Sequence, residues 1–292
     1  MITPQREAVI RNIEDAAARG DLNCKVEVGD PVFTEEMRKE TLERFLQNQT
    51  NPLYWMKNFI ARRLADMFTW HLNRDTKIIG LEKLKEIEGG AIITSNHFNP
   101  IENTAIRRMT QKLRKGRLCI VNQDTNLGMT GLFGFFMNYI DIIPINQNLG
   151  WLKNHFDKLL TRSLKAKQLV LIYPEQEMWF NYRKPRPSKS GAYVFAARNM
   201  VPIISCFVEI RDKDQLETEQ FYQTQYILHI LDTIYPDPNK SVSENGRDMC
   251  ARDYQQKVDA YERCYGKKLD YAFTPWDIAG WIPSNESSAK SQ

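Results

Sequence analysis

From about residue 77 onward, the chain alternates between short apolar runs and longer segments with apolar residues every three or four positions. Each short run ends at Gly, Pro or a polar cluster, which is typical of strands. The seven runs are "TKIIGLEKL", "GGAIITSN", "GRLCIVNQ", "IDIIPINQ", "QLVLIYPE", "VPIISCFVEI" and "YILHILDTIYP". Helical stretches between them are "NTAIRRMTQKLRK", "LGWLKNHFDKLLTRSLKA" and "KSGAYVFAARNM". The alternation predicts an α/β fold with a mixed, largely parallel sheet flanked by helices.

Residues 1–50 have a different pattern, polar and helical. "PQREAVIRNIEDAAARG" ends at a Gly, and "TEEMRKETLERFLQNQ" opens with Thr34 as a cap and acids in its first turn. We therefore divide the chain into an N-terminal helical region, 1–75, and an α/β domain with a C-terminal extension, 76–292. The extension contains one more polar helix over 245–266, and its last residues are expected to fray.

The segment "NPLYWMKNFIARRLADMFTWHL" has the period of an amphipathic helix. Its predicted apolar face consists of Leu53, Met56, Phe59, Ile60, Leu64, Met67, Phe68 and His71. Lys57, Asn58, Arg62 and Asp66 lie on the other side. Such a helix can lie in a bilayer interface, which would make the N-terminal region a membrane-docking cap. Most amphipathic helices cover their own core instead, and that is the arrangement we expect.

Composition narrows the class of protein. The net charge is +4 with a pI near 8.7, which tolerates anionic partners without requiring them. The five cysteines are scattered without CxxC spacing, so we expect no disulfide framework and no metal site. The N-terminus lacks the apolar run of a signal peptide, and no run of about 18 apolar residues occurs. We expect a cytoplasmic protein bound peripherally to the inner face of the cell membrane.

Candidate chemistry follows two predicted strands, at "SNHFNPIE" and "YPEQEMWFNYRKPRPSKSG". In open α/β sheets functional groups gather beyond the carboxyl ends of strands. Pro100 disfavours helix at Asn99, so the chain turns between His97 and Glu102. A turn can bring the Glu102 carboxylate to the His97 imidazole, which would leave the other ring nitrogen as a general base. The alternative is a histidine that only caps or hydrogen-bonds locally.

Four ordered blocks between about 77 and 210 resemble the glycerolipid acyltransferases of the bacterial lysophosphatidate acyltransferase type. "NHFNPIE" at 96–102 is similar to the family's Asn-His-x4-Asp motif and follows a Gly-x-Glu-x-Leu stretch, "GLEKL". "GLFGFFMNYIDIIPINQ" is similar to the second block. "YPEQEM" followed by "KSGA" resembles the third block, Phe-Pro-Glu-Gly-Thr-Arg and Lys-x-Gly-Ala, and "VPIIS" the fourth.

The resemblance implies an O-acyltransferase that needs no cofactor and takes acyl-CoA or acyl-carrier protein as co-substrate. His97 would deprotonate the acceptor hydroxyl. Glu102, which stands in place of the family's Asp, would orient the imidazole of His97. The implied acceptor is a lysophospholipid such as 1-acylglycerol 3-phosphate. Asn96, Gln147 and Gln176 would belong to the substrate-binding set, and Glu175 would shape the acceptor site.

Departures from the family pattern affect the acceptor. In the family, arginines of the second and third blocks hold the acceptor phosphate. Here Gln147 stands in place of the second block's Arg, and Gln176-Glu177-Met178 stands in place of the third block's Gly-Thr-Arg. Downstream cations could rebuild a phosphate site or only solvate a loop: Arg183, Lys184, Arg186 and Lys189. A phosphate-free lipid acceptor, such as a glycolipid or an amino-acid lipid, is therefore the alternative. Two further alternatives are a non-catalytic acyl-lipid-binding protein and a thioesterase.

Two segments bear on the lipid partners. "IRRMTQKLRKGR" is a basic amphipathic stretch that could meet an anionic membrane or simply form solvated helix surface. "GMTGLFGFFMNYIDII", rich in Gly and Phe, could line an acyl-chain tunnel or pack as ordinary core. We expect no nucleic-acid partner, because no platform of basic and aromatic residues occurs.

Overall fold

The computed structural model describes residues 5–29, 32–113 and 117–283. Its centre is a seven-stranded sheet with the order β1-β7-β6-β2-β5-β3-β4. The strands are β1 (Lys77–Ile79), β2 (Ala91–Thr94), β3 (Leu118–Gln123), β4 (Ile142–Ile145), β5 (Leu169–Ile172), β6 (Ile203–Thr218) and β7 (Phe221–Ile230). β6 and β7 pair antiparallel, and the other neighbours pair parallel. The predicted mixed, largely parallel sheet is confirmed, with a strand at each of the seven apolar runs.

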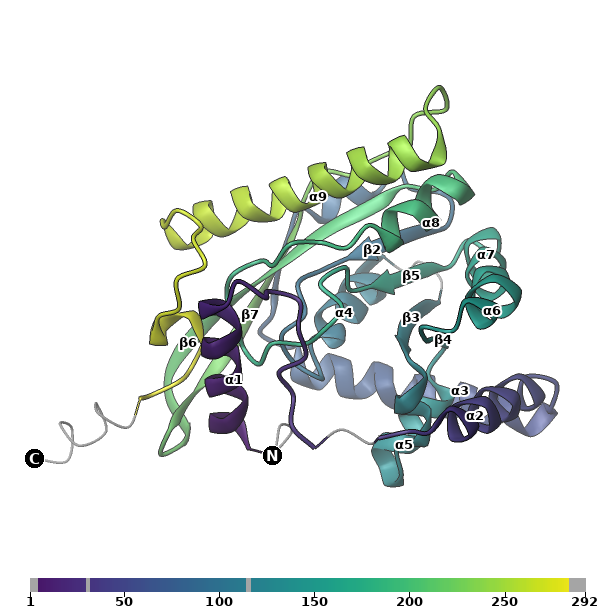
Figure 1. The fold of residues 1–292 in the computed structure, drawn as a ribbon, viewed down its shortest axis with the longest axis horizontal. Helices are drawn as coiled ribbons and strands as arrows, with labels where there is room; N and C mark the ends of the chain where they lie inside the picture. The colour runs from purple at the N-terminus through teal and green to yellow at the C-terminus, as the bar shows by residue number, and fades with distance from the viewer. Residues whose placement is uncertain (1–4, 30–31, 114–116, 284–292) are drawn as a thin grey trace, which may run out of the picture.

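Helices cover both faces of the sheet (Figure 1). The longer ones are α1 (Arg6–Ala18), α2 (Glu35–Asn48), α3 (Pro52–Leu72), α4 (Asn103–Leu113), α5 (Gly131–Tyr139), α7 (Asp157–Lys165), α8 (Gly191–Asn199) and α9 (Val242–Tyr265). The turn α6 (Leu149–Trp151) and a π-helical turn, η3 (Leu152–Phe156), lead directly into α7. α7, α8 and α9 bury their apolar residues on one face of the sheet, and α4 buries Ile106 and Met109 on the other. Two 3-10 turns, η1 (Leu81–Leu84) and η2 (Asp124–Gly128), follow β1 and β3, and a third, η4 (Pro275–Asp277), lies near the C-terminus.

β2 lies in the middle of the sheet and positions the first candidate motif. All four of its residues are buried, because β5 and β6 flank it and helices cover both faces. Its carboxyl end therefore delivers residues 95–102 to the same sheet edge as the segment after β5. The two motifs predicted to share an edge do so.

The β6–β7 hairpin is longer than its apolar run suggested, since β6 continues to Thr218. The outer half of β6 is exposed and rich in charge, so it carries no hydrophobic pattern to predict it. α1 packs near this end through Val9, Ile10 and Ile13, which share a cluster with Phe221. Part of the N-terminal helical region therefore packs beside the far end of the sheet (Figure 1).

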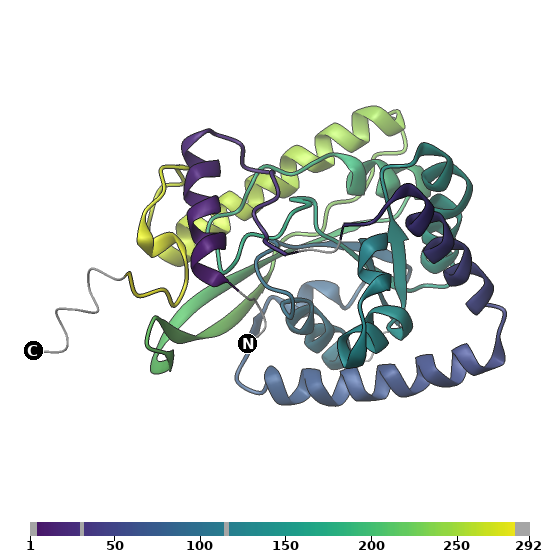
Figure 2. The same ribbon diagram turned by 60° about the horizontal axis from the view of Figure 1, so that its bottom comes forward.

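The expected orientation of the helix at 52–72 is wrong. α3 packs against α4 and α5 through its small and polar residues, with Asn58, Ala61, Ala65 and Thr69 buried. Its large apolar residues are exposed, among them Phe59 at 58% and Met67 at 65%. The reason is specific bonding on the polar side: the Asn58 amide donates to Tyr139 O at 2.7 Å and to Asp141 Oδ1 at 2.9 Å. Figure 2 shows α3 as one long helix along an outer edge of the molecule.

Within the described residues, none of the helices is both long enough and apolar enough to span a membrane. The basic stretch at 106–117 only partly faces solvent, because Arg107 is buried against α3 and the sheet. Arg114 and Lys115 of that stretch, and the end of the chain expected to fray, lie outside the described residues.

Candidate active site

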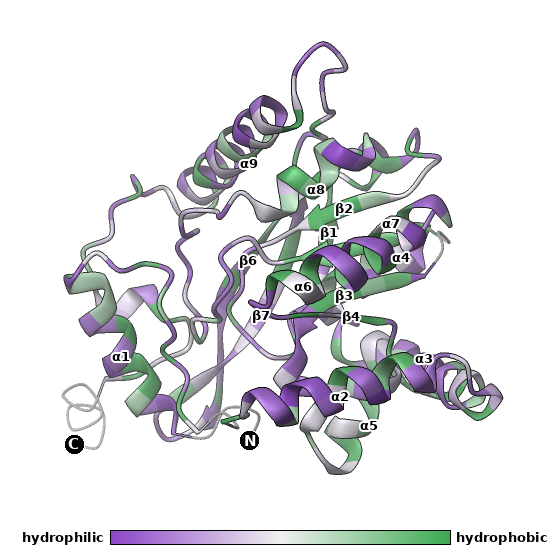
Figure 3. Cartoon of the chain, turned by 45° about the vertical axis from the view of Figure 1, so that its right-hand side comes forward, coloured by the Kyte–Doolittle hydropathy of each residue, from purple (hydrophilic) through white to green (hydrophobic). Residues whose placement is uncertain are grey.

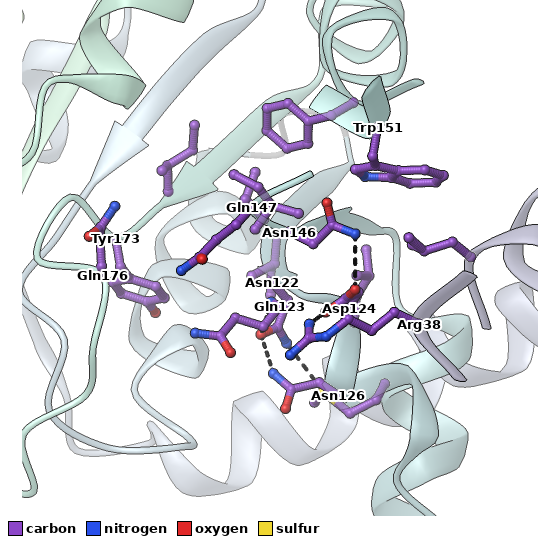
Figure 4. Close-up of a pocket in the computed structure, with 18 of the residues that line it drawn as sticks. Arg38, Asn122, Gln123, Asp124, Asn126, Asn146, Gln147, Trp151, Tyr173 and Gln176 are labelled. Carbon is purple, nitrogen blue, oxygen red and sulfur yellow. Dashed lines mark hydrogen bonds and ion pairs between the residues drawn. The ribbon is translucent and has the colours of Figure 1, made fainter. Parts of the chain in front are cut away.

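A cavity of about 1660 Å³ opens at the carboxyl ends of β2, β3, β4 and β5. His97 and Glu102 line it after β2, Asn122 and Gln123 at the end of β3, and Gln147 after β4. The segment after β5 adds Tyr173, Gln176 and Glu177, and α2 closes one side with Leu42 and Leu46. Figure 4 shows side chains from these separate segments arranged around one space.

The imidazole of His97 is held by Glu102, as the turn around Pro100 predicted. Glu102 Oε1 contacts His97 Nδ1, and Glu102 Oε2 accepts from the backbone N–H groups of Phe98 and, at 2.7 Å, Asn99. Glu102 is buried immediately before α4 and uses both of its oxygens in these contacts. Because Nδ1 is occupied, Nε2 is the nitrogen of His97 that is left to exchange a proton with a substrate.

Tyr173 is a site residue that the sequence analysis missed. Its ring stacks on the imidazole of His97, with centroids 4.1 Å apart and planes 9° from parallel. Burial, and then the charge of Glu102, raise the pKa of Tyr173 well above 10, so its hydroxyl stays neutral. The signal was available: Tyr173 follows β5, which pairs in parallel with β2.

Glu175 contacts the backbone of His97 and does not line the cavity. Its carboxylate accepts the backbone N–H of His97 at 3.1 Å and pairs with Arg186 at 2.9 Å. Arg186 also donates to the carbonyl of His97 at 3.3 Å. Both side chains are buried and neither lines the cavity. The structure thus gives Glu175 and Arg186 a positioning role, not the acceptor-shaping or phosphate-binding roles suggested by the sequence.

Three other predicted substrate-binding residues do not line the cavity. The Asn96 side chain exchanges two hydrogen bonds with the backbone of Val208 in β6, at 3.0 and 2.8 Å. Arg183 is buried and bonds to Asp212 at 2.6 Å. Lys184 is buried and bonds to Asp277 at 2.9 Å. We therefore correct their assignment: the three side chains hold the fold together, and the two cations are already neutralised.

Gln147, Gln176 and Lys189, which were also expected at the substrate site, line the cavity, and all three are exposed. Gln176 has a left-handed backbone with φ of 68°. A side chain in this conformation costs roughly 1–2 kcal/mol, which glycine avoids. The position corresponds to the Gly of the family's third block, so this chain keeps an amide there at a conformational cost.

A polar wall of the cavity was not predicted. Arg38 of α2 forms an ion pair with Asp124, and Asp124 accepts a second bond from Asn146 at 3.1 Å (Figure 4). Asn122 accepts from the side chain of Asn126. Only the folded sheet brings these groups together, since they come from α2 and from the ends of β3 and β4.

Another part of the lining is apolar. Residues from the Gly- and Phe-rich segment contribute to it, namely Met129, Phe133, Met137, Ile140 and Ile142. Phe156 and Ile172 continue the same surface from the neighbouring helix and strand. One cavity therefore combines a base, a polar wall and an apolar channel, which suits an amphipathic substrate.

One cluster outside the cavity has metal-ligand chemistry among the described residues: Glu209, His229 and Cys264. His229 Nε2 lies 2.8 Å from Glu209 Oε2 and 3.4 Å from Cys264 Sγ. Arg211 bonds to the other oxygen of Glu209. Burial, followed by Glu209, raises the pKa of Cys264 to about 12. These side chains are satisfied by their own hydrogen bonds, and a cation there would meet the charge of Arg211.

Comparisons with known proteins agree with this geometry. Residues 75–209 match the family model described as Acyltransferase. No curated protein matches the chain in sequence. Among solved structures, the 1-acyl-sn-glycerophosphate acyltransferase PlsC from Thermotoga maritima has a similar fold, with a TM-score of 0.50 and 12% identity. That match covers 80% of this chain and 90% of the other. The acyltransferase match thus covers residues 75–209, the part of the chain that holds His97 and Glu102, and the fold of the chain is similar to that of a 1-acyl-sn-glycerophosphate acyltransferase.

Proposed function

We propose that this acyltransferase moves a fatty acyl group from a thioester, acyl-CoA or acyl-carrier protein, to a hydroxyl of a lipid. The observation that carries the proposal is the His97–Glu102 pair, fixed in a turn at the edge of an amphipathic cavity. A lysophospholipid such as 1-acylglycerol 3-phosphate is the acceptor that the resemblance implies. The solved relative carries the name of an enzyme for 1-acyl-sn-glycerophosphate.

In the proposed reaction, Nε2 of His97 takes the proton of the acceptor hydroxyl as its oxygen attacks the thioester carbonyl. The tetrahedral intermediate then expels the thiolate, and His97 returns the proton to that sulfur. The products are the new ester and the free thiol, and no acyl-enzyme forms. General-base assistance of this kind contributes typically 10²–10⁴-fold.

A nucleophilic serine is not required and finds no support nearby. Ser95 is buried at 1%, and its hydroxyl bonds to Asn96 at 3.3 Å instead of lining the cavity. This supports direct transfer over a covalent serine mechanism.

We further propose that α3 docks on a membrane surface and that the lipid acceptor enters from there. Its exposed apolar side chains are flanked by Lys57, Arg62 and Arg63. α5 packs beside α3, and both carry hydrophobic residues at the same edge of the molecule (Figure 3). Leu132 and Phe133 of α5 are exposed, and Phe133 also lines the cavity. An apolar path thus connects the docking face to the site.

The test is acyl transfer from radiolabelled acyl-CoA and acyl-carrier protein to total lipids, with wild type, His97→Ala, Glu102→Gln and Glu102→Asp. We expect at least a 100-fold loss for the first two variants, because they remove the base or the charge that orients it. Glu102→Asp keeps the charge and should stay within about tenfold of wild type. Glu86→Gln, an exposed carboxylate ahead of β2, is the matched control.

Each alternative has its own outcome. Free fatty acid that depends on His97, with no labelled lipid, would identify a thioesterase. Lipid binding with no turnover of either donor would identify a non-catalytic binding protein. Equal rates for wild type and His97→Ala would remove His97 from the mechanism.

A further inference from the structure

We infer that the acceptor carries a phosphate-free head group with several hydroxyls, a sugar or a glycerol, rather than a phosphomonoester. The inference rests on the proposed acyl transfer and concerns only which lipid the same cavity accepts. Three observations carry it: the charge of the cavity lining, the partners of its cations, and its density of side-chain amides.

The cavity is acidic although the chain as a whole is basic. Seven of its lining residues are Asp or Glu, and three are Lys or Arg. Glu177 follows Gln176 on the segment after β5, whose Tyr173 stacks on His97, and it accepts from Gln123 at 3.4 Å. A phosphate carries up to two negative charges and would be repelled here, whereas a hydroxyl can donate to a carboxylate.

The cations of the lining are poorly suited to hold a phosphate. Arg38 is the one guanidinium among the lining residues, and it is paired with the buried carboxylate of Asp124. Lys39 lies 4.0 Å from Glu43 on the exposed side of α2. Lys189 is exposed and follows the β5 segment. The cavity therefore lacks an available fork of guanidinium donors, the group best matched to phosphate oxygens.

Side-chain amides, which carry no net charge, are the most numerous polar groups in the lining of the cavity. Ten of the lining residues are Asn or Gln. An amide both donates and accepts, as a hydroxyl does, so an amide-rich wall matches a polyol without any net charge. Within the described part of the chain, the side chains of Gln147 and Gln176 have no hydrogen-bond partner and are exposed in the cavity. Figure 4 shows both among the side chains around the cavity, Gln147 after β4 and Gln176 after β5.

The first experiment compares three acceptors that share an oleoyl chain: 1-oleoylglycerol 3-phosphate, 1-oleoylglycerol and its galactosyl derivative. Each is presented in micelles of a polyoxyethylene detergent, which has no sugar hydroxyls of its own. We expect kcat/KM at least tenfold higher for the galactosyl lipid than for the phosphate, with 1-oleoylglycerol between them. Equal values, or a preference for the phosphate, would overturn the inference and leave acyl transfer intact.

Failure of the proposed function looks different in the same assay. In that case none of the three lipids gains label in a His97-dependent way, whereas a wrong head group still gives a labelled product that His97→Ala abolishes.

Two variants test the amides directly. Gln176→Gly relieves the left-handed conformation, so the fold is retained, and loss of one hydrogen bond should raise KM for the galactosyl lipid about three- to tenfold with little change in kcat. Gln147→Arg supplies an unpaired guanidinium and should shift the ratio of the two kcat/KM values at least tenfold toward the phosphate. Gln215→Arg, exposed on the outer part of β6, is the charge-matched control and should leave the ratio unchanged. An unchanged ratio with Gln147→Arg would remove Gln147 from acceptor recognition.

Discussion

Two buried carboxylates determine where the His97 imidazole sits. Glu102 holds its ring, and Glu175 holds its backbone N–H from the opposite side. Glu102 was predicted from its spacing to His97, because a turn at Pro100 brings the two together. The role of Glu175 was not predicted. Its partner Arg186 lies eleven residues further along the chain, and Arg186 reaches Glu175 only after the intervening chain has folded back.

Replacing the charge of Glu175 should destabilise the protein more than it changes binding. Glu175→Gln leaves the buried guanidinium of Arg186 without its counter-charge, which typically costs about 3–5 kcal/mol. We expect this loss in urea unfolding, together with a lower kcat and a nearly unchanged KM in the folded fraction. Glu88→Gln, at an exposed site, is the control. Wild-type stability in Glu175→Gln would show that the Glu175–Arg186 pair does not brace the site.

At the scale of elements, α3 shows the limit of a hydrophobic pattern. The periodicity identified an amphipathic helix and the members of its apolar face. It did not indicate which face meets the protein, because both faces can pack. The polar face makes specific bonds to Tyr139 of α5 and to Asp141, just before β4, and this decides the orientation.

The exposed face of α3 gives a prediction about membrane binding. Phe59→Ser with Met67→Ser removes two exposed apolar side chains, so folding stability should change little while vesicle binding weakens. Each side chain buried in a bilayer contributes about 1.5–3 kcal/mol, so we expect at least a tenfold loss in co-sedimentation with anionic vesicles. Leu216→Ser, an equally exposed apolar residue on the β6–β7 hairpin, is the control. Binding that is equally weakened by both changes would argue against α3 as the docking element.

At the scale of the whole molecule, alkaline pH should weaken the fold through its buried thiols. Burial raises the pKa of Cys206 to about 12 and that of Cys119 to about 11, from 9 in the unfolded chain. Above pH 9 the unfolded state therefore binds fewer protons than the folded state, and stability falls as pH rises.

This stabilisation is fully present below pH 9 and is lost between pH 9 and about 12. Each thiol contributes a slope of about 1.4 kcal/mol per pH unit, from pH 9 to about 11 for Cys119 and from pH 9 to about 12 for Cys206. Urea unfolding at pH 8, 9 and 10 measures the effect. Cys206→Ala should make the slope shallower, and an identical slope in that variant would show that Cys206 does not contribute.

The sequence by itself determined the sheet and the pairing of His97 with Glu102. Strands that are buried on both faces must be apolar throughout, so their runs are visible without an alignment, and a turn between His97 and Glu102 is a local property. The tertiary structure alone decided which charges are already paired, which face α3 exposes, and that amides from three strand ends meet in one cavity. These depend on contacts between segments distant in sequence, and no local pattern encodes the partner that each side chain finds.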